Sequence, residues 1–136
     1  MYKNLLVPIM LDQRPLADLA IKAAQLLQDD DGSITLLHVM EGVPEYIRAQ
    51  LPQGAFDAAK TDILTRMKAV ADSAGIKAAI EVVSGHPGRS IVDFARAEDM
   101  NCIVVASHRP GLQDYFIGST AAFVVRHASC SVHVMR

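Results

Sequence analysis

The loop that follows a short apolar run carries the residue types best suited to chemistry in this chain. After residues 103–106 the chain supplies Arg109, and then Gly118, Ser119 and Thr120 directly before a segment with helical spacing. The first backbone N–H groups of a helix have no partner inside the helix and lie at the positive end of its dipole. Gly118 lets a ligand approach the backbone, the two hydroxyls can donate hydrogen bonds, and Arg109 can pair with a phosphate oxygen. The pattern therefore indicates an anion site of phosphate size.

The same residues also have a simpler interpretation. In this interpretation Ser119 is simply the N-cap of the helix that follows it, and its hydroxyl accepts a hydrogen bond from a backbone N–H of that helix. Arg109 can equally be a solvated surface charge. Local sequence leaves both interpretations open, because Gly-Ser before a helix is a common pair.

Other reactive side chains give weaker patterns. His38, His86 and His108 fall near the ends of predicted strands, but no pair has ligand spacing and no cysteine or carboxylate joins them. We therefore predict no metal site and place His86 and His108 at the rim of the pocket. Ser107, His108 and Asp114 share one loop without the pattern of a catalytic triad, so no catalytic residue is assigned.

Alternating strand and helix patterns must position these residues. Continuous apolar runs predict buried strands at 5–10, 34–40 and 103–106, and a more polar run predicts an edge strand at 77–83. An alternating run predicts a last strand at 131–135. Apolar residues at helical spacing predict helices at 16–27, 56–74 and 119–127, with a further helix opened by 85–88. This order favours an α/β fold with an open, doubly wound parallel sheet and helices on both faces. Ligands of such sheets bind beyond the carboxyl ends of the strands, here after the first and fourth strands.

Local signals predict where several of these elements stop. Pro8 lacks a ladder donor and should end or bulge the first strand. Residues 29–32, Asp-Asp-Asp-Gly, should break the first helix as a solvated helix end, and Gly75 should cap the second helix. Residues 41–54 contain two prolines and two glycines, and they predict a mobile connection.

Composition limits the class of protein. The 136 residues fit one domain over 1–136, and the 51% of hydrophobic residues with only 5% aromatic ones predict an aliphatic core. A net charge of −2 gives no reason to bind nucleic acid or an anionic membrane. Cys102 and Cys130 are expected to be reduced core residues. The apolar run near the start is too short for a signal sequence or membrane span, which favours a cytoplasmic location.

Four further segments, together with the loop, resemble the universal stress protein family over the whole chain. They are Leu5-Leu6-Val7-Pro8-Ile9, Leu37-His38-Val39, Gly85-His86-Pro87 with Ile91, and the run from Arg126 to Val134. The family's loop signature is Gly, two residues, Gly, nine residues, Gly, then Ser or Thr. Here Ala106 and Arg109 replace the first two glycines and eight residues precede Gly118, a form similar to the F/G-type branch. Met10 stands where the family usually has an Asp, so a ribose or metal contact from that carboxylate is lost.

The resemblance implies a five-stranded sheet of order 3-2-1-4-5, like that of the adenine nucleotide alpha hydrolases, and a site for ATP or AMP. Pro8, Ile9 and Val39 would border the base, and Ala106 and Ser107 would line the ribose side. The phosphates would be held by Arg109, Gly118, Ser119 and Thr120. A role for Mg is left open because the family's Asp is replaced by Met10.

The resemblance also implies a symmetric homodimer formed through the last strand, with Val132 and Val134 near the interface. The free N–H and C=O groups of a terminal edge strand need such covering. The leading hypothesis is a dimeric stress-response protein that binds an adenine nucleotide and is at most a slow ATP hydrolase. One alternative is a dimeric protein-interaction module that binds no nucleotide. Another is an adenylate-forming enzyme, for which the sequence supplies no identifiable catalytic residue.

Overall fold

The computed structural model describes residues 1–42, 45–107 and 117–136. Its elements in chain order are β1 (Tyr2–Pro8), α1 (Arg14–Leu27), β2 (Gln28–Glu41), α2 (Glu45–Arg48), α3 (Ala55–Ala74), β3 (Ala78–Gly85), α4 (Pro87–Ala97), β4 (Cys102–Ala106), α5 (Ser119–His127) and β5 (Ser131–Met135). In the described part of the chain, no helix combines the length and the apolarity that a membrane crossing requires.

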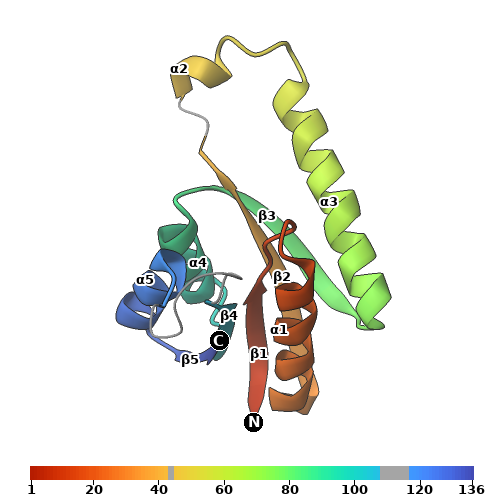
Figure 1. The fold of residues 1–136 in the computed structure, drawn as a ribbon, viewed down its shortest axis with the longest axis vertical. Helices are drawn as coiled ribbons and strands as arrows, with labels where there is room; N and C mark the ends of the chain where they lie inside the picture. Colours follow the sequence, from red (N-terminus) through yellow and green to blue (C-terminus); the bar gives the residue numbers. More distant parts are fainter. Residues whose placement is uncertain (43–44, 108–116) are drawn as a thin grey trace.

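All five strands form one parallel sheet in the order β3-β2-β1-β4-β5 (Figure 1). The predicted order 3-2-1-4-5 is therefore confirmed, as is the edge position of β3. The winding direction reverses between β1 and β4, which lie side by side with Leu5 opposite Cys102 and Leu6 opposite Ile103. Below these pairs, the Asn4 and Asn101 backbones are joined because Asn101 N–H donates to the Asn4 carbonyl at 2.8 Å. The sheet thus has a switch point where ligand sites form in such folds.

Two aliphatic layers enclose the sheet and confirm that helices cover both faces. On one face, α1 and α3 pack with Leu5, Val7 and Leu36. On the other face, α4 and α5 pack with Leu6 and Leu37 and with Val105 of β4. Because neighbouring residues of β1 enter different layers, both faces of that strand are buried, as its continuous apolar run predicts.

The start of β2 differs from the sequence expectation. Residue types place 29–32 at the end of the first helix, but α1 ends at Leu27 and β2 begins at Gln28. The pairing moves from Tyr2 with Gln28 to Asn4 with Ser33, so the acidic residues form a bulge against Lys3. The Met1 ammonium lies 2.5 Å from a carboxylate oxygen of Asp29, an ion pair with the chain terminus that residue propensities cannot predict.

Two predicted element ends agree with the structure, although β1 begins at Tyr2, before its predicted start at residue 5. β1 ends at Pro8, and Pro15 lies in the first turn of α1. Gly75 follows α3 with a φ of 68°, the left-handed conformation that favours glycine at this position. Its N–H donates to the Asp72 carbonyl at 3.1 Å, so the end of α3 is capped.

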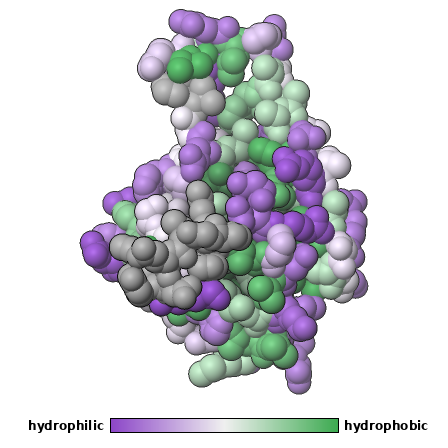
Figure 2. All heavy atoms as spheres, viewed as in Figure 1, coloured by the Kyte–Doolittle hydropathy of each residue, from purple (hydrophilic) through white to green (hydrophobic). Residues whose placement is uncertain are grey.

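A projecting arm, formed by α2 and the first half of α3 (residues 45–64), does not follow from the sequence pattern. It stands beyond the end of the sheet (Figure 1), and hydrophobic spheres gather there in Figure 2. Tyr46, Ile47 and Leu51 are exposed, and the Arg48 guanidinium lies 3.9 Å from the centre of the Phe56 ring. The second half of α3 returns to the sheet and buries Met67, Val70 and Ala71.

The two cysteines are free thiols that belong to opposite layers of the core. Cys102 is buried in the layer with α1 and α3, whereas the half-buried Cys130 packs against the layer with α4 and α5. Burial raises the pKa of both thiols, and the neighbouring Cys130 thiol adds to the increase for Cys102. Thiolate is the reactive form of cysteine, so both side chains are poor nucleophiles.

Gly88 sets how closely α4 approaches α5. A Cβ at this position would lie 2.8 to 2.9 Å from Cβ, Cγ and Cδ1 of Phe123. The Phe123 ring is in turn enclosed by the His127 ring, 4.2 Å between centroids, and by the His86 ring at 5.5 Å. The ring therefore has little room to yield to a larger residue.

Replacing Gly88 by Ala should destabilise the fold by about 1–3 kcal/mol through overpacking, which outweighs a gain of up to about 1 kcal/mol in helix propensity. Chemical denaturation measures the free energy of unfolding. In a Phe123→Ala background the same Gly88→Ala change should destabilise the fold clearly less, because Cγ and Cδ1 of the ring are gone and only the Cβ contact remains. Equal destabilisation in both backgrounds would show that the ring contact is not the cause.

Candidate functional site

The carboxyl ends of β1 and β4 bring predicted site residues to one edge of the sheet. β1 ends at Pro8, and β4 ends at Ala106 with Ser107 immediately after it. The two strands are neighbours, so the base-side and ribose-side residues of the prediction share the switch point. Val39 lies farther along β2, which runs past the end of β1 and continues to pair with β3 through Val83.

Ser107 anchors the beginning of the loop after β4. Its N–H donates to the Met135 carbonyl at 2.9 Å, and its hydroxyl lies 3.4 Å from the same oxygen. Only 6% of the residue is exposed. The Met135 carbonyl at the end of β5 therefore fixes Ser107, the residue at which the chain leaves the sheet.

Gly118 returns the chain to the same point. A Cβ on Gly118 would lie 3.2 Å from the Ser107 carbonyl oxygen, so the two ends of the loop almost touch. The φ of Gly118 is −59°, which any residue can adopt, so close approach is the feature that favours glycine. A larger residue would have to push the helix start away from Ser107.

The start of α5 offers donors to a ligand. Gly118 is the N-cap, Ser119 is the first helical residue, and no side chain of the described part of the chain caps this end of the helix. The alternative expectation that Ser119 caps its own helix is therefore wrong. The first helical bond runs from Ala122 N–H to the Gly118 carbonyl at 2.9 Å, which leaves the N–H groups of Ser119 and Thr120 ahead of the helical ladder. Exposed Ser119 and half-buried Thr120 thus stand where an anion would receive backbone and hydroxyl donors.

His38 makes a contact that the sequence analysis did not assign. Its ring Nδ1 lies 2.8 Å from the carbonyl oxygen of Ile9, and Ile9 N–H donates to the Leu37 carbonyl at 2.8 Å. Both backbone polar groups of Ile9, its N–H and its carbonyl, are therefore held by residues of β2. In the sequence, His38 stands out only as a histidine near the end of a predicted buried strand, and this pattern suggests no role beyond that of a metal ligand.

The remaining predicted residues have different positions. Arg109, with His108 and Asp114, lies outside the described residues. His86 is the N-cap of α4, and its ring Nδ1 accepts a hydrogen bond from Arg89 N–H at 3.2 Å. Within residues 1–42, 45–107 and 117–136, no cluster of histidine, cysteine and acidic side chains has the geometry to hold a metal ion.

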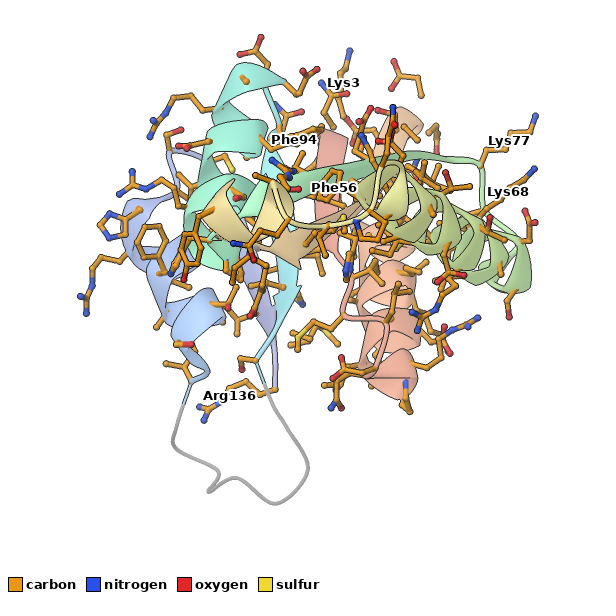
Figure 3. All side chains as sticks on the ribbon, turned by 90° about the horizontal axis from the view of Figure 1, so that it is seen from above. Lys3, Phe56, Lys68, Lys77, Phe94 and Arg136 are labelled. Carbon is orange, nitrogen blue, oxygen red and sulfur yellow. The ribbon has the colours of Figure 1, made fainter. Side chains whose placement is uncertain are left out.

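Two surface hollows lie at the opposite, amino edge of the sheet. The larger, about 820 Å³, is lined by residues that include Tyr2, Asn101 and Cys130. The other, about 520 Å³, is bordered by Lys68 and Lys77, which point outward from the end of α3 and the start of β3 in Figure 3. Neither contains a predicted site residue, and in parallel sheets ligands bind at the other edge. We therefore assign the candidate site to the carboxyl edge despite these hollows.

Comparisons with known proteins agree with this architecture. The model of the universal stress protein family matches residues 1–136. Universal stress protein G of Salmonella typhimurium is 30% identical, with the alignment covering 100% of both chains. The structure of the universal stress protein UspA from Lactobacillus plantarum matches with a TM-score of 0.69 and 26% identity, covering 99% of this chain and 98% of that one. A universal stress protein from Archaeoglobus fulgidus, solved in complex with dAMP, shares the fold with a TM-score of 0.64 and 20% identity over 99% and 98% of the chains.

The family match and the sheet topology point to the same conclusion. The likeness to a G-type relative agrees with the loop form in which Arg109 and Gly118-Ser119 stand. The switch point between β1 and β4 lies where the sequence predicts the site. This chain belongs to the universal stress protein family.

Proposed function

We propose that this protein binds an adenine nucleotide, ATP or AMP, at the carboxyl edge of its sheet and acts in the stress response as a cytoplasmic dimer. The observation that supports this most is the return of Gly118 to within contact of Ser107. This return places the start of α5, which no side chain among the described residues caps, beside the switch point. A dAMP complex of a protein with the same fold supports the choice of an adenine nucleotide.

Each predicted residue has a role in this proposal. Pro8, Ile9 and Val39 border the base, while Ala106 and Ser107 line the ribose side. The phosphates meet the N–H groups and hydroxyls of Ser119 and Thr120 at the close approach permitted by Gly118. Arg109 stands in place of the family's second glycine, where its guanidinium adds positive charge to the phosphate side.

Hydrolysis is not the activity that these residues support. Phosphoryl transfer needs a group that orients the attacking water and usually a metal ion that stabilises the charge on the phosphates. Met10, 39% exposed just beyond β1, stands at the family's carboxylate position and offers only a thioether. We therefore propose a nucleotide-binding regulator in which any ATP hydrolysis is slow, and we assign Mg no residue.

A second candidate function is a protein-interaction module that binds no nucleotide. Met10, Ala106 and Arg109 replace residues of the family's nucleotide signature, and side chains at Ala106 and Arg109 would narrow the phosphate path. The arm adds a specific reason, because Tyr46, Ile47 and Leu51 expose apolar surface beyond the sheet. The nucleotide measurement separates the two functions.

Calorimetric titration of the purified protein with ATP and with AMP should detect binding at millimolar nucleotide or below. Gly118→Val should weaken ATP binding at least about tenfold, equivalent to about 1.4 kcal/mol, because the side chain displaces the helix start from Ser107. Gly42→Ala is the control, since a Cβ there would meet nothing within 4 Å. Absence of binding heat and of a thermal shift with both nucleotides would contradict the proposal and favour the interaction module.

We further propose that β5 forms the dimer contact. β5 is an edge strand, with β4 as its neighbour on one side. Val132 and Val134 turn their side chains toward the layer with α4 and α5 while remaining half-buried, so a partner strand would cover what is left exposed. Such pairing supplies hydrogen bonds to the free edge.

Light scattering at micromolar concentration should give a mass of twice the 14.7 kDa chain. Val132→Lys should shift the mass toward the monomer, whereas Val125→Lys, at an exposed position of α5, should leave the dimer intact. Circular dichroism confirms that both variants are folded. A wild-type protein that remains monomeric would refute dimerisation directly, without reference to the variants.

A further inference from the structure

At the end of β1, Pro8 lacks a backbone hydrogen-bond donor, and the next residue, Ile9, is bonded to β2. Pro8 has no backbone N–H to donate to a neighbouring strand, yet it still pairs in register with Leu37 of β2. Ile9, the next residue, is only 3% exposed, and its N–H donates to the Leu37 carbonyl at 2.8 Å. Beyond it the chain turns away from the sheet, with Gln13 N–H donating to the Met10 carbonyl at 3.0 Å. Ile9 is thus the last residue of this segment that β2 fixes through its backbone.

His38 completes the hold on Ile9. Its ring Nδ1 lies 2.8 Å from the Ile9 carbonyl oxygen. A carbonyl oxygen can only accept, so Nδ1 must carry the proton in this bond. In the neutral ring Nε2 is then the unprotonated nitrogen, and the ring is fixed in a single tautomer by the backbone that follows β1.

We infer that His38 is a positioning residue for the nucleotide site, acting through the Ile9 carbonyl. This inference rests on the proposed nucleotide function, in which Pro8 and Ile9 border the base. Without the ring, the Ile9 carbonyl has no partner among the described side chains, and the Ile9 backbone keeps a single hydrogen bond to β2. The phosphate side is built separately, from Ser107, Gly118 and the first turn of α5. Loss of His38 therefore affects the base side and leaves the phosphate side intact.

The tautomer tests the contact itself, without any nucleotide. A long-range proton–nitrogen NMR spectrum of the imidazole rings, recorded near pH 8, should show His38 protonated at Nδ1. His38→Ala identifies the signal. A ring protonated at Nε2 instead would overturn the inference, because such a ring cannot donate to the Ile9 carbonyl from Nδ1.

Binding of two probes tests the positioning role. His38→Ala should weaken ATP binding about tenfold, as expected for one lost hydrogen bond that orders the rim. The same variant should bind inorganic tripolyphosphate as the wild type does, because this probe engages only the phosphate side. His38→Asn should restore most of the ATP affinity, since its amide can donate from a position close to Nδ1. His133→Ala, at an exposed position of β5, is the control and should change neither affinity.

The outcomes separate this inference from the proposed function. Equal loss of both probes in His38→Ala, or loss of neither, would overturn the positioning role while leaving nucleotide binding established. A wild-type protein that binds neither probe would refute the proposed function, and the positioning role with it, even with His38 in the expected tautomer. Selective loss of ATP binding with recovery in His38→Asn supports the inference, because general destabilisation would weaken both probes.

Discussion

The close pairing of β1 with β4 is the constraint on which the rest of the molecule depends. A parallel sheet that winds in both directions from two central strands must leave their carboxyl ends uncovered by crossover connections. In this chain those ends carry Pro8 and Ser107. Aliphatic layers on both faces hold the two strands in place, with Leu5 and Leu6 fully buried on opposite sides. The position of the candidate binding edge thus follows from the packing of the two aliphatic layers against β1 and β4.

The loop after β4 depends on the same constraint at its two ends. It leaves the sheet at Ser107, which is bonded to the last strand, and returns at Gly118, where there is hardly room for a Cβ. Any ligand at the start of α5 must therefore lie next to the ends of β1 and β4. The first N–H groups of α5, uncapped by any side chain in the described part of the chain, give this location an electrostatic preference for anions. The close approach of the Gly118 and Ser107 backbones thus links the fold to the candidate binding chemistry.

Much of this arrangement could be predicted from the sequence because each signal is local. Continuous apolar runs predict the buried strands, and Pro8 and Gly75 mark the ends of β1 and α3 through their backbone restrictions. Sequence patterns do not predict the bulge at residues 29–32, because the contacts there, such as the ion pair of Lys3 with Asp31, form only when β1 and β2 lie side by side. The contact of His38 with Ile9 was missed for the same reason, since it joins two segments that are far apart in sequence. The arm shows a third limit, because α3 has a continuous amphipathic pattern although only its second half meets the sheet.

The central claim is that an adenine nucleotide binds at the edge between β1 and β4. Titration of the isotope-labelled protein with ATP, followed through its backbone amide NMR signals, tests the location and the binding together. We expect saturable shifts at Ile9, Ser107, Gly118, Ser119 and Thr120, with the amino edge around Asn101 unaffected. Unchanged spectra at millimolar ATP, or shifts confined to the amino edge, would contradict the claim.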